Sequence, residues 1–124
     1  MTPEEFVSDL KRNVHDPAID GVVAQLAEPS GRRPGQKLRE LSSWFNALPE
    51  QQRENVRSAV GLGVHAALFG VLCAIDGVTK VTDATLELRL RSAGEVLLLN
   101  ADSDECLHDL YQAKVYEQLF GPVV

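Results

Sequence analysis

Residues 59–75 read AVGLGVHAALFGVLCAI, seventeen residues in which His65 is the only strongly polar side chain. A membrane-spanning helix needs about 20 predominantly apolar residues, and shorter apolar runs usually belong to the core of a soluble protein. The glycines Gly61, Gly63 and Gly70 would let neighbouring elements approach the backbone closely. The run therefore predicts a central helix that other elements surround on nearly all sides, rather than a membrane segment.

The segments before this run predict three shorter helices. Residues 2–5 read TPEE, a helix start in which Thr2 is the N-cap and Glu5 completes a capping box. Asp16-Pro17 repeats the start signal and predicts a second helix. The loop of residues 28–35 carries two prolines and two glycines, so it fits neither a helix nor a central strand. After it, a third helix is predicted from apolar residues at helical spacing: Leu38, Leu41, Trp44, Phe45 and Leu48.

The hydrophobic period changes from that of a helix to that of a strand after Asp76. Leucines at positions 86, 88 and 90 alternate with charged residues, and residues 96–99 predict the antiparallel partner across a short loop. An isolated hairpin is marginally stable in water, so its leucine face should lie on the helices. Asp102 or Ser103 is the predicted cap of a last helix, which ends at Gly121-Pro122.

These elements predict a single α+β domain over residues 1–124. The domain is mostly helical, with about four N-terminal helices, a two-stranded antiparallel hairpin and a C-terminal helix. The composition agrees with one soluble globular domain, because 44% of the residues are hydrophobic and 24% are charged.

The net charge and the N-terminal sequence indicate which partners and which cellular location to expect. The formal net charge of −6 argues against nucleic-acid binding, since such domains are usually strongly basic. The N-terminus has neither the basic nor the apolar region of a secretory signal, and Cys73 and Cys106 lack the spacing of a disulfide or metal motif. We therefore expect a reducing, cytoplasmic location.

No catalytic signature is complete in the sequence. Gly61-x-Gly63-x-x-Ala66 matches the letters of a dinucleotide-binding motif, but the preceding residues predict a helix where that motif requires a strand. Cys73 lies in the most apolar stretch, where a thiol stays protonated, and acidic neighbours oppose activation of Cys106 by the helix dipole. We expect no cofactor and no resident metal, and the lack of a complete catalytic motif favours a non-enzymatic protein.

The histidines leave one enzymatic alternative open. Asp104 and His108 are four residues apart and would share one helix face, with Asp109 beside them. The fold could add His65 or Asp76, and such a set would suit a small metal-dependent hydrolase. No spacing typical of a metal site is present, however, and a histidine in an apolar helix is more often a core residue hydrogen-bonded to a carbonyl. The sequence does not decide whether these side chains converge.

Charge is distributed unevenly along the chain. Residues 81–124 carry eight acidic and three basic side chains, whereas residues 31–57 carry a net charge of +3. Acidic residues at a helix start stabilise the helix dipole, which explains part of the acidic run. The remainder predicts a surface that attracts a basic partner protein. The candidate protein-binding residues are Asp102, Asp104, Glu105 and Asp109.

Arg32 and Arg33 lie in the loop rich in proline and glycine. Two adjacent guanidinium groups are a candidate site for a phosphate or carboxylate anion. A solvated surface loop accounts for them as well, because such loops are normally polar.

Several strings resemble those of a family of small bacterial proteins. The strings are Trp44-Phe45-Asn46-x-Leu48-Pro49, Phe69-Gly70-x-Leu72-Cys73-x-Ile75-Asp76-Gly77-Val78, Leu97-Leu98-Leu99-Asn100 and Leu107-His108-Asp109-Leu110. The resemblance covers about residues 29–111. It implies a bacterial cytoplasmic protein, and it implies no functional residue because no activity is attached to the family.

Small size, an acidic C-terminal third and the lack of a catalytic signature predict a non-enzymatic protein-binding module. An inhibitor or immunity-type partner of a basic protein, such as a nuclease toxin, fits this description best. The alternative is the metal-dependent hydrolase, and a third interpretation is a homodimer whose interface covers part of the helix over residues 59–75. We expect neither a nucleic acid nor a membrane as partner.

Overall fold

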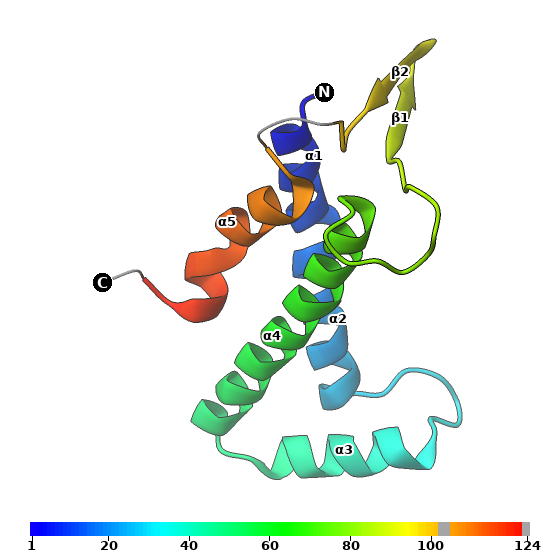
Figure 1. The fold of residues 1–124 in the computed structure, drawn as a ribbon. Coiled ribbons are helices and arrows are strands. Elements are labelled where there is room, and N and C mark those ends of the chain that lie inside the picture. The colour runs from blue at the N-terminus through cyan, green and yellow to red at the C-terminus, as the bar shows by residue number, and fades with distance from the viewer. Residues whose placement is uncertain (102–104, 123–124) are drawn as a thin grey trace.

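The structure is a computed structural model that describes residues 1–101 and 105–122. Its elements are α1 (Pro3–Leu10), a π-helical segment (Lys11–His15), α2 (Asp16–Ala27), α3 (Gln36–Ala47), α4 (Glu50–Ile75), β1 (Arg89–Ser92), β2 (Glu95–Leu98) and α5 (Leu107–Phe120). Figure 1 shows α4 as the long diagonal helix, with α3 lying below its N-terminal end and the β1–β2 hairpin projecting near its C-terminal end. The predicted α+β, mostly helical fold is confirmed.

The first two predicted helices form one continuous helix interrupted by the π segment. The N-terminal capping box is present, because the Glu5 N–H donates to Thr2 Oγ1 (3.1 Å) and the Thr2 N–H donates to the Glu5 carboxylate (3.2 Å). Helix α2 begins at Asp16 with Pro17 in its first turn, as predicted, but the backbone of Asp16 is itself helical and continues the π segment. The wider π turn, in which the Asp16 N–H bonds to the Lys11 carbonyl, accommodates the ring and the missing N–H of proline. Asp16 is therefore not an N-cap.

The hydrophobic core lies where α1, the C-terminal half of α4, α5 and the base of the hairpin meet. Its buried members are Val7, Leu72, Leu99, Leu107, Tyr111 and Val115. Leu88 and Leu90 pack against this core, which agrees with the predicted leucine face. The tip of the hairpin extends into solvent instead, so Val96 and Leu97 are exposed.

The hairpin has the predicted antiparallel arrangement. Arg89 pairs with Leu98 and Ser92 pairs with Glu95. Its two-residue loop consists of Ala93 and Gly94, both with positive φ (49° and 82°), as in the turns whose twist matches that of a hairpin. Regular pairing therefore begins three residues later than the leucine alternation predicted.

The N-terminus of α5 differs from the prediction. Asp102 and Ser103, the predicted caps, lie outside the described residues, and α5 begins only at Leu107 with Cys106 as N-cap. The Cys106 side chain makes no capping hydrogen bond. Asp76, at the end of α4, instead accepts a hydrogen bond from the His108 N–H at the start of α5 (2.9 Å). The C-terminus of α5 follows the prediction, because Gly121 takes a positive φ of 85°.

Helix α4 is far less enclosed than its sequence predicted. α5 packs against one side of it and α2 with the π segment against another. Its buried residues are Gly61, Leu72 and Cys73. The prediction of a helix surrounded on nearly all sides is wrong, because the hairpin and α3 extend outward rather than over it. The apolar stripe of α3 is likewise only partly covered, since Phe45 is buried whereas Trp44 is half-exposed.

Candidate functional site

Two of the four predicted protein-binding acids lie within the described residues. Asp102 and Asp104 lie outside the described residues. Glu105 is exposed just before α5, and Asp109 lies in the first turn of α5 with a side chain that is 73% exposed. The acidic end that the structure describes is therefore the N-terminus of α5.

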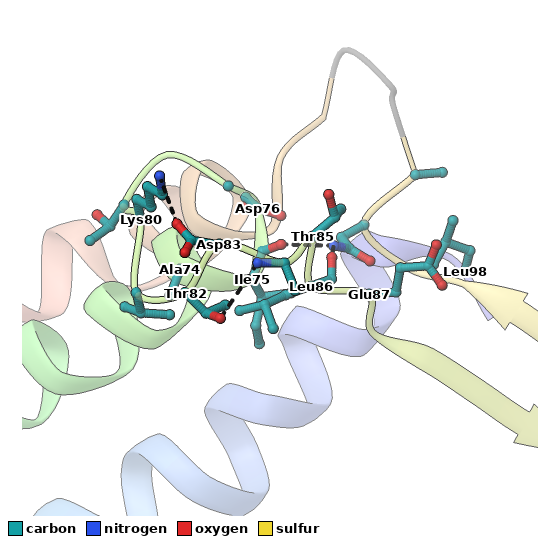
Figure 2. Close-up of a pocket in the computed structure, with 16 residues that line it drawn as sticks. Ala74, Ile75, Asp76, Lys80, Thr82, Asp83, Thr85, Leu86, Glu87 and Leu98 are labelled. Carbon is teal, nitrogen blue, oxygen red and sulfur yellow. Dashed lines mark hydrogen bonds and ion pairs between the residues drawn. The ribbon is translucent and has the colours of Figure 1, made fainter.

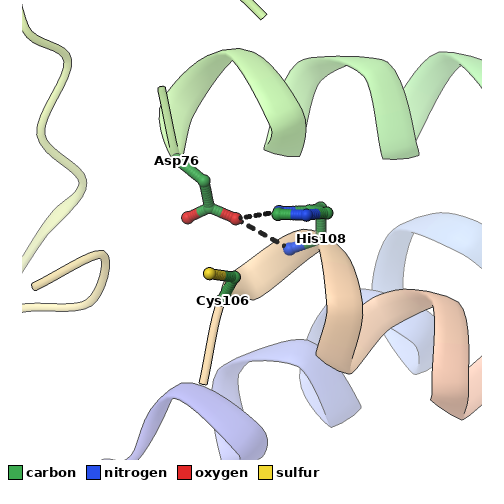
Figure 3. A group of neighbouring side chains, drawn as sticks. All are labelled: Asp76, Cys106 and His108. Atoms are coloured by element: carbon green, nitrogen blue, oxygen red, sulfur yellow. Dashed lines mark hydrogen bonds and ion pairs between the residues drawn. The ribbon is translucent and has the colours of Figure 1, made fainter. Parts of the chain in front are cut away.

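Asp76, Cys106 and His108 come together where α4 ends and α5 begins (Figure 3). Asp76 Oδ2 lies 2.6 Å from His108 Nδ1, in addition to its contact with the His108 backbone N–H. The ligand atoms of the three side chains all lie within 4.8 Å of one another. The side chains of Asp76 and His108 are only 4% and 11% exposed. This grouping is the best-assembled cluster of chemically active side chains in the described part of the chain.

The His108 ring lies between two carboxylates. Asp76 contacts its Nδ1, and Asp109 Oδ1 lies 3.4 Å from its Nε2. Among the described residues, no lysine or arginine lies within ion-pair distance of either carboxylate. The arrangement fixes the orientation of the imidazole and concentrates negative charge at the N-terminus of α5, whose dipole stabilises it, whereas the dipole of α4 opposes the charge of Asp76 at its C-cap. Asp76 and His108 thus converge, a possibility that the sequence left open.

His65 does not join this cluster. It stacks between Phe69 and Tyr111, with ring centroids 5.4 and 5.7 Å away, and its Nε2 contacts the side-chain oxygen of Gln112. This agrees with the interpretation of His65 as a core histidine bonded to a carbonyl, here the side-chain amide of a neighbouring helix.

His15 is a buried histidine that the sequence analysis did not single out. It lies in the π segment, and its Nδ1 is 2.6 Å from the hydroxyl of Tyr111. Its Nε2 has no hydrogen-bond partner among the described residues. Burial lowers the pKa of His15, although the nearby Asp16 opposes the shift, and burial raises the pKa of Tyr111 to about 12. No local pattern marks His15, because its burial depends on the packing of α5 against the π segment.

We expect stability to fall in mild acid because of His15. Its pKa is lowered from 6.5 in the folded chain, so the unfolded chain takes up the proton first as the pH falls below about 6.5. The free energy of unfolding should therefore decrease between about pH 7 and pH 5. Urea unfolding across this range measures it, and His15→Gln should flatten the slope. An equal slope in the variant would assign the pH dependence to other groups.

A cavity of about 540 Å³ adjoins the Asp76 end of α4 (Figure 2). The loop of residues 76–87 forms most of its lining, and Lys80 pairs with Asp83 (3.1 Å) there. Asn100 attaches this loop to α4, since its Nδ2 donates to the carbonyls of Ile75 (2.8 Å) and Leu86 (2.9 Å). Asn100 belongs to one of the strings that carried the resemblance, and its observed role is structural.

Arg32 and Arg33 belong neither to the cluster of Asp76, Cys106 and His108 nor to the lining of the cavity. Both are exposed in the loop between α2 and α3, and neither makes a hydrogen bond or ion pair with a described residue. The predicted anion site therefore rests on these two side chains alone.

The uncovered side of α4 is a second candidate surface. Its exposed residues are Ala59, Leu62, Gly63, Ala66, Ala67, Gly70 and Val71. By length and composition α4 could cross a membrane, a test that core helices of soluble proteins also pass, but only 17% of its most apolar stretch is buried here. A helix this apolar is normally covered by other elements on most of its surface. In this chain one apolar side of α4 is exposed to water instead.

No protein-family model, curated protein or solved structure matches the chain. The resemblance to small bacterial proteins therefore stays a prediction.

Proposed function

We propose that this protein is a non-enzymatic protein-binding module for a partner with a basic surface. The observation that carries the proposal is the exposed apolar side of α4. Isolated apolar residues on a surface are ordinary, but a continuous apolar helix face marks a place of contact.

The small residues on this face favour a protein partner that approaches closely. A β-carbon at Gly61 would lie 2.8 Å from Leu119, so this glycine serves the packing of α5 on α4. Gly63 and Gly70 face open space, so nothing within the described chain requires them. Glycine inside a helix costs about 1 kcal/mol relative to alanine. Gly63 and Gly70 would allow the backbone of a partner protein to pack closely against α4.

The charge of the chain favours a basic partner. The net charge is −6, and the acidic N-terminus of α5 adjoins the end of α4 through the contact between His108 and Asp76. Acidic groups beside an apolar contact area accelerate association with a basic protein and disfavour acidic competitors. An inhibitor or immunity-type role in the bacterial cytoplasm belongs to the same proposal.

Capture experiments with matched variants test this function. Tagged wild-type protein should retain a basic protein from a lysate of the source organism at low salt, and Ala66→Glu should lose it. Asp109→Lys should slow association and flatten its salt dependence. Val22→Glu, an exposed position on α2, is the control and should bind normally. Titration calorimetry with the purified partner then gives the affinities.

Three results would contradict the proposal. One is binding that Ala66→Glu and Asp109→Lys leave unchanged. Another is a homodimer that Ala66→Glu dissociates, because a second copy would then cover α4. The third is sedimentation of the wild-type protein with lipid vesicles, which would make a membrane the occupant.

The metal-dependent hydrolase predicted from His108, Asp104 and Asp109 has less support. Asp104 lies outside the described residues. Asp76 and Asp109 approach opposite nitrogens of the His108 ring, so one metal ion cannot bind His108 together with both carboxylates.

A further inference from the structure

We propose that Asp76, Cys106 and His108 form a binding site for one zinc ion. The three side chains offer a carboxylate oxygen, a thiolate sulfur and an imidazole nitrogen, which are the donors that zinc takes in proteins. They come from the end of α4 and the start of α5, so two well-packed helices position them. The proposal is independent of the protein-binding function.

The distances suit a single ion after a small adjustment. Zinc binds these donors at about 2.0–2.3 Å, so ligand atoms around one ion stand roughly 3–4 Å apart. The three ligand atoms lie within 4.8 Å of one another, and the pair formed by Asp76 Oδ2 and His108 Nδ1 is 2.6 Å apart. This pair must separate by less than about 1 Å as the ion replaces the proton between its atoms.

Asp109 provides the outer partner that a metal-bound histidine requires. When zinc occupies Nδ1 of the neutral ring, the ring proton resides on Nε2, and Asp109 Oδ1 lies 3.4 Å from that atom. A histidine ligand commonly donates its second N–H to a carboxylate, which fixes the ring and increases its basicity. The proton that zinc displaces from Nδ1 is balanced by the proton that the neutral ring carries on Nε2, and the Cys106 thiol releases its proton to solvent, so binding of one zinc ion liberates one proton in net.

The local electrostatics also favour a cation. Two carboxylates flank the ring of His108, and no lysine or arginine among the described residues pairs with either. Cys106 is the N-cap of α5, where the positive end of the helix dipole offsets part of the repulsion that the acidic neighbours exert on a thiolate, and a bound cation removes the rest. Three protein ligands leave the fourth tetrahedral position to solvent, and Asp76 also lines the 540 Å³ cavity.

Cobalt substitution tests the site with a thiolate-specific signal. The full-length protein, first stripped with a chelator, is titrated with Co²⁺ while the charge-transfer absorption of a cobalt–thiolate bond is recorded. We expect saturation at one ion per chain and displacement by Zn²⁺. Cys106→Ser should abolish the thiolate band, whereas Cys73→Ser should retain it, because Cys73 is the only other cysteine in the chain.

A second variant separates ligand loss from loss of the fold. Asp109→Asn keeps all three ligands and should weaken zinc binding about 10–100-fold, the effect typical of removing an outer-shell partner. Calorimetry gives the affinity, and circular dichroism confirms that each variant is folded. Absence of a thiolate band in the wild-type protein, or its persistence in Cys106→Ser, would overturn the proposal.

Discussion

Replacing Asp76 with alanine is expected to lower the free energy of unfolding by about 3 kcal/mol. One carboxylate oxygen of Asp76 accepts from both the backbone N–H and the ring of His108, and it joins the end of α4 to the start of α5. Removal leaves the N-terminus of α5 without its cap and an almost buried imidazole without its acceptor. Each loss is costly, because a buried polar group that has lost its partner keeps its full desolvation penalty.

Urea unfolding in the presence of a chelator measures this effect in the metal-free protein. Asp83→Ala is the matched control, since its carboxylate is 99% exposed and pairs only with Lys80 among the described residues. The control should unfold at the wild-type urea concentration, because exposed ion pairs contribute little. Equal stability of Asp76→Ala and the wild-type protein would show that another group caps α5.

Tyr111→Ala is expected to cost about 4 kcal/mol, the effect typical of deleting a buried aromatic ring. Tyr111 is fully buried among the core residues, stacks on His65 and contacts the ring of His15 through its hydroxyl. Domains of this size are stable by only about 5–15 kcal/mol, so the variant should be partly unfolded near physiological temperature. Thermal unfolding followed by circular dichroism gives the change.

Tyr111→Phe, with Tyr116→Phe as its control, separates the contribution of the Tyr111 hydroxyl to stability from that of the ring. Tyr111→Phe removes only the hydroxyl and should cost about 1–3 kcal/mol, because it leaves His15 without a described hydrogen-bond partner. Tyr116 is the only other tyrosine in the chain and is partly exposed, so Tyr116→Phe should be neutral. If both phenylalanine variants unfold at the wild-type temperature, the contact between His15 and Tyr111 contributes nothing to stability.

Features encoded by neighbouring residues were predictable. The capping box at Thr2 and Glu5, the alternating leucines of the hairpin and the glycine that ends α5 are each specified within a few positions. Such signals act through local backbone geometry, which a single sequence records. They were sufficient for the order of the elements and for the fold class.

Features that depend on distant contacts were missed or left open. Asp76 and His108 are 32 residues apart, and the segment between them, which contains the hairpin, gives no indication that the ends of α4 and α5 meet. Cys106 was considered only as an isolated thiol because no other cysteine lies near it in sequence. The exposure of α4 was missed for a related reason, since hydropathy records how apolar a helix is and not how many neighbours cover it.

The π segment has a consequence for how the N-terminal helix tolerates changes in length. A π turn closes its hydrogen bond over five residues where an α turn uses four, so losing one residue between positions 11 and 14 would restore regular α winding and leave α2 in nearly its present phase. Ile19 and Leu26 would keep their buried positions, and α3, which packs on α2, would stay in place. Losing one residue within α2 itself would instead rotate everything that follows by about 100°. A single-residue deletion in the π segment should therefore be better tolerated than one in the middle of α2.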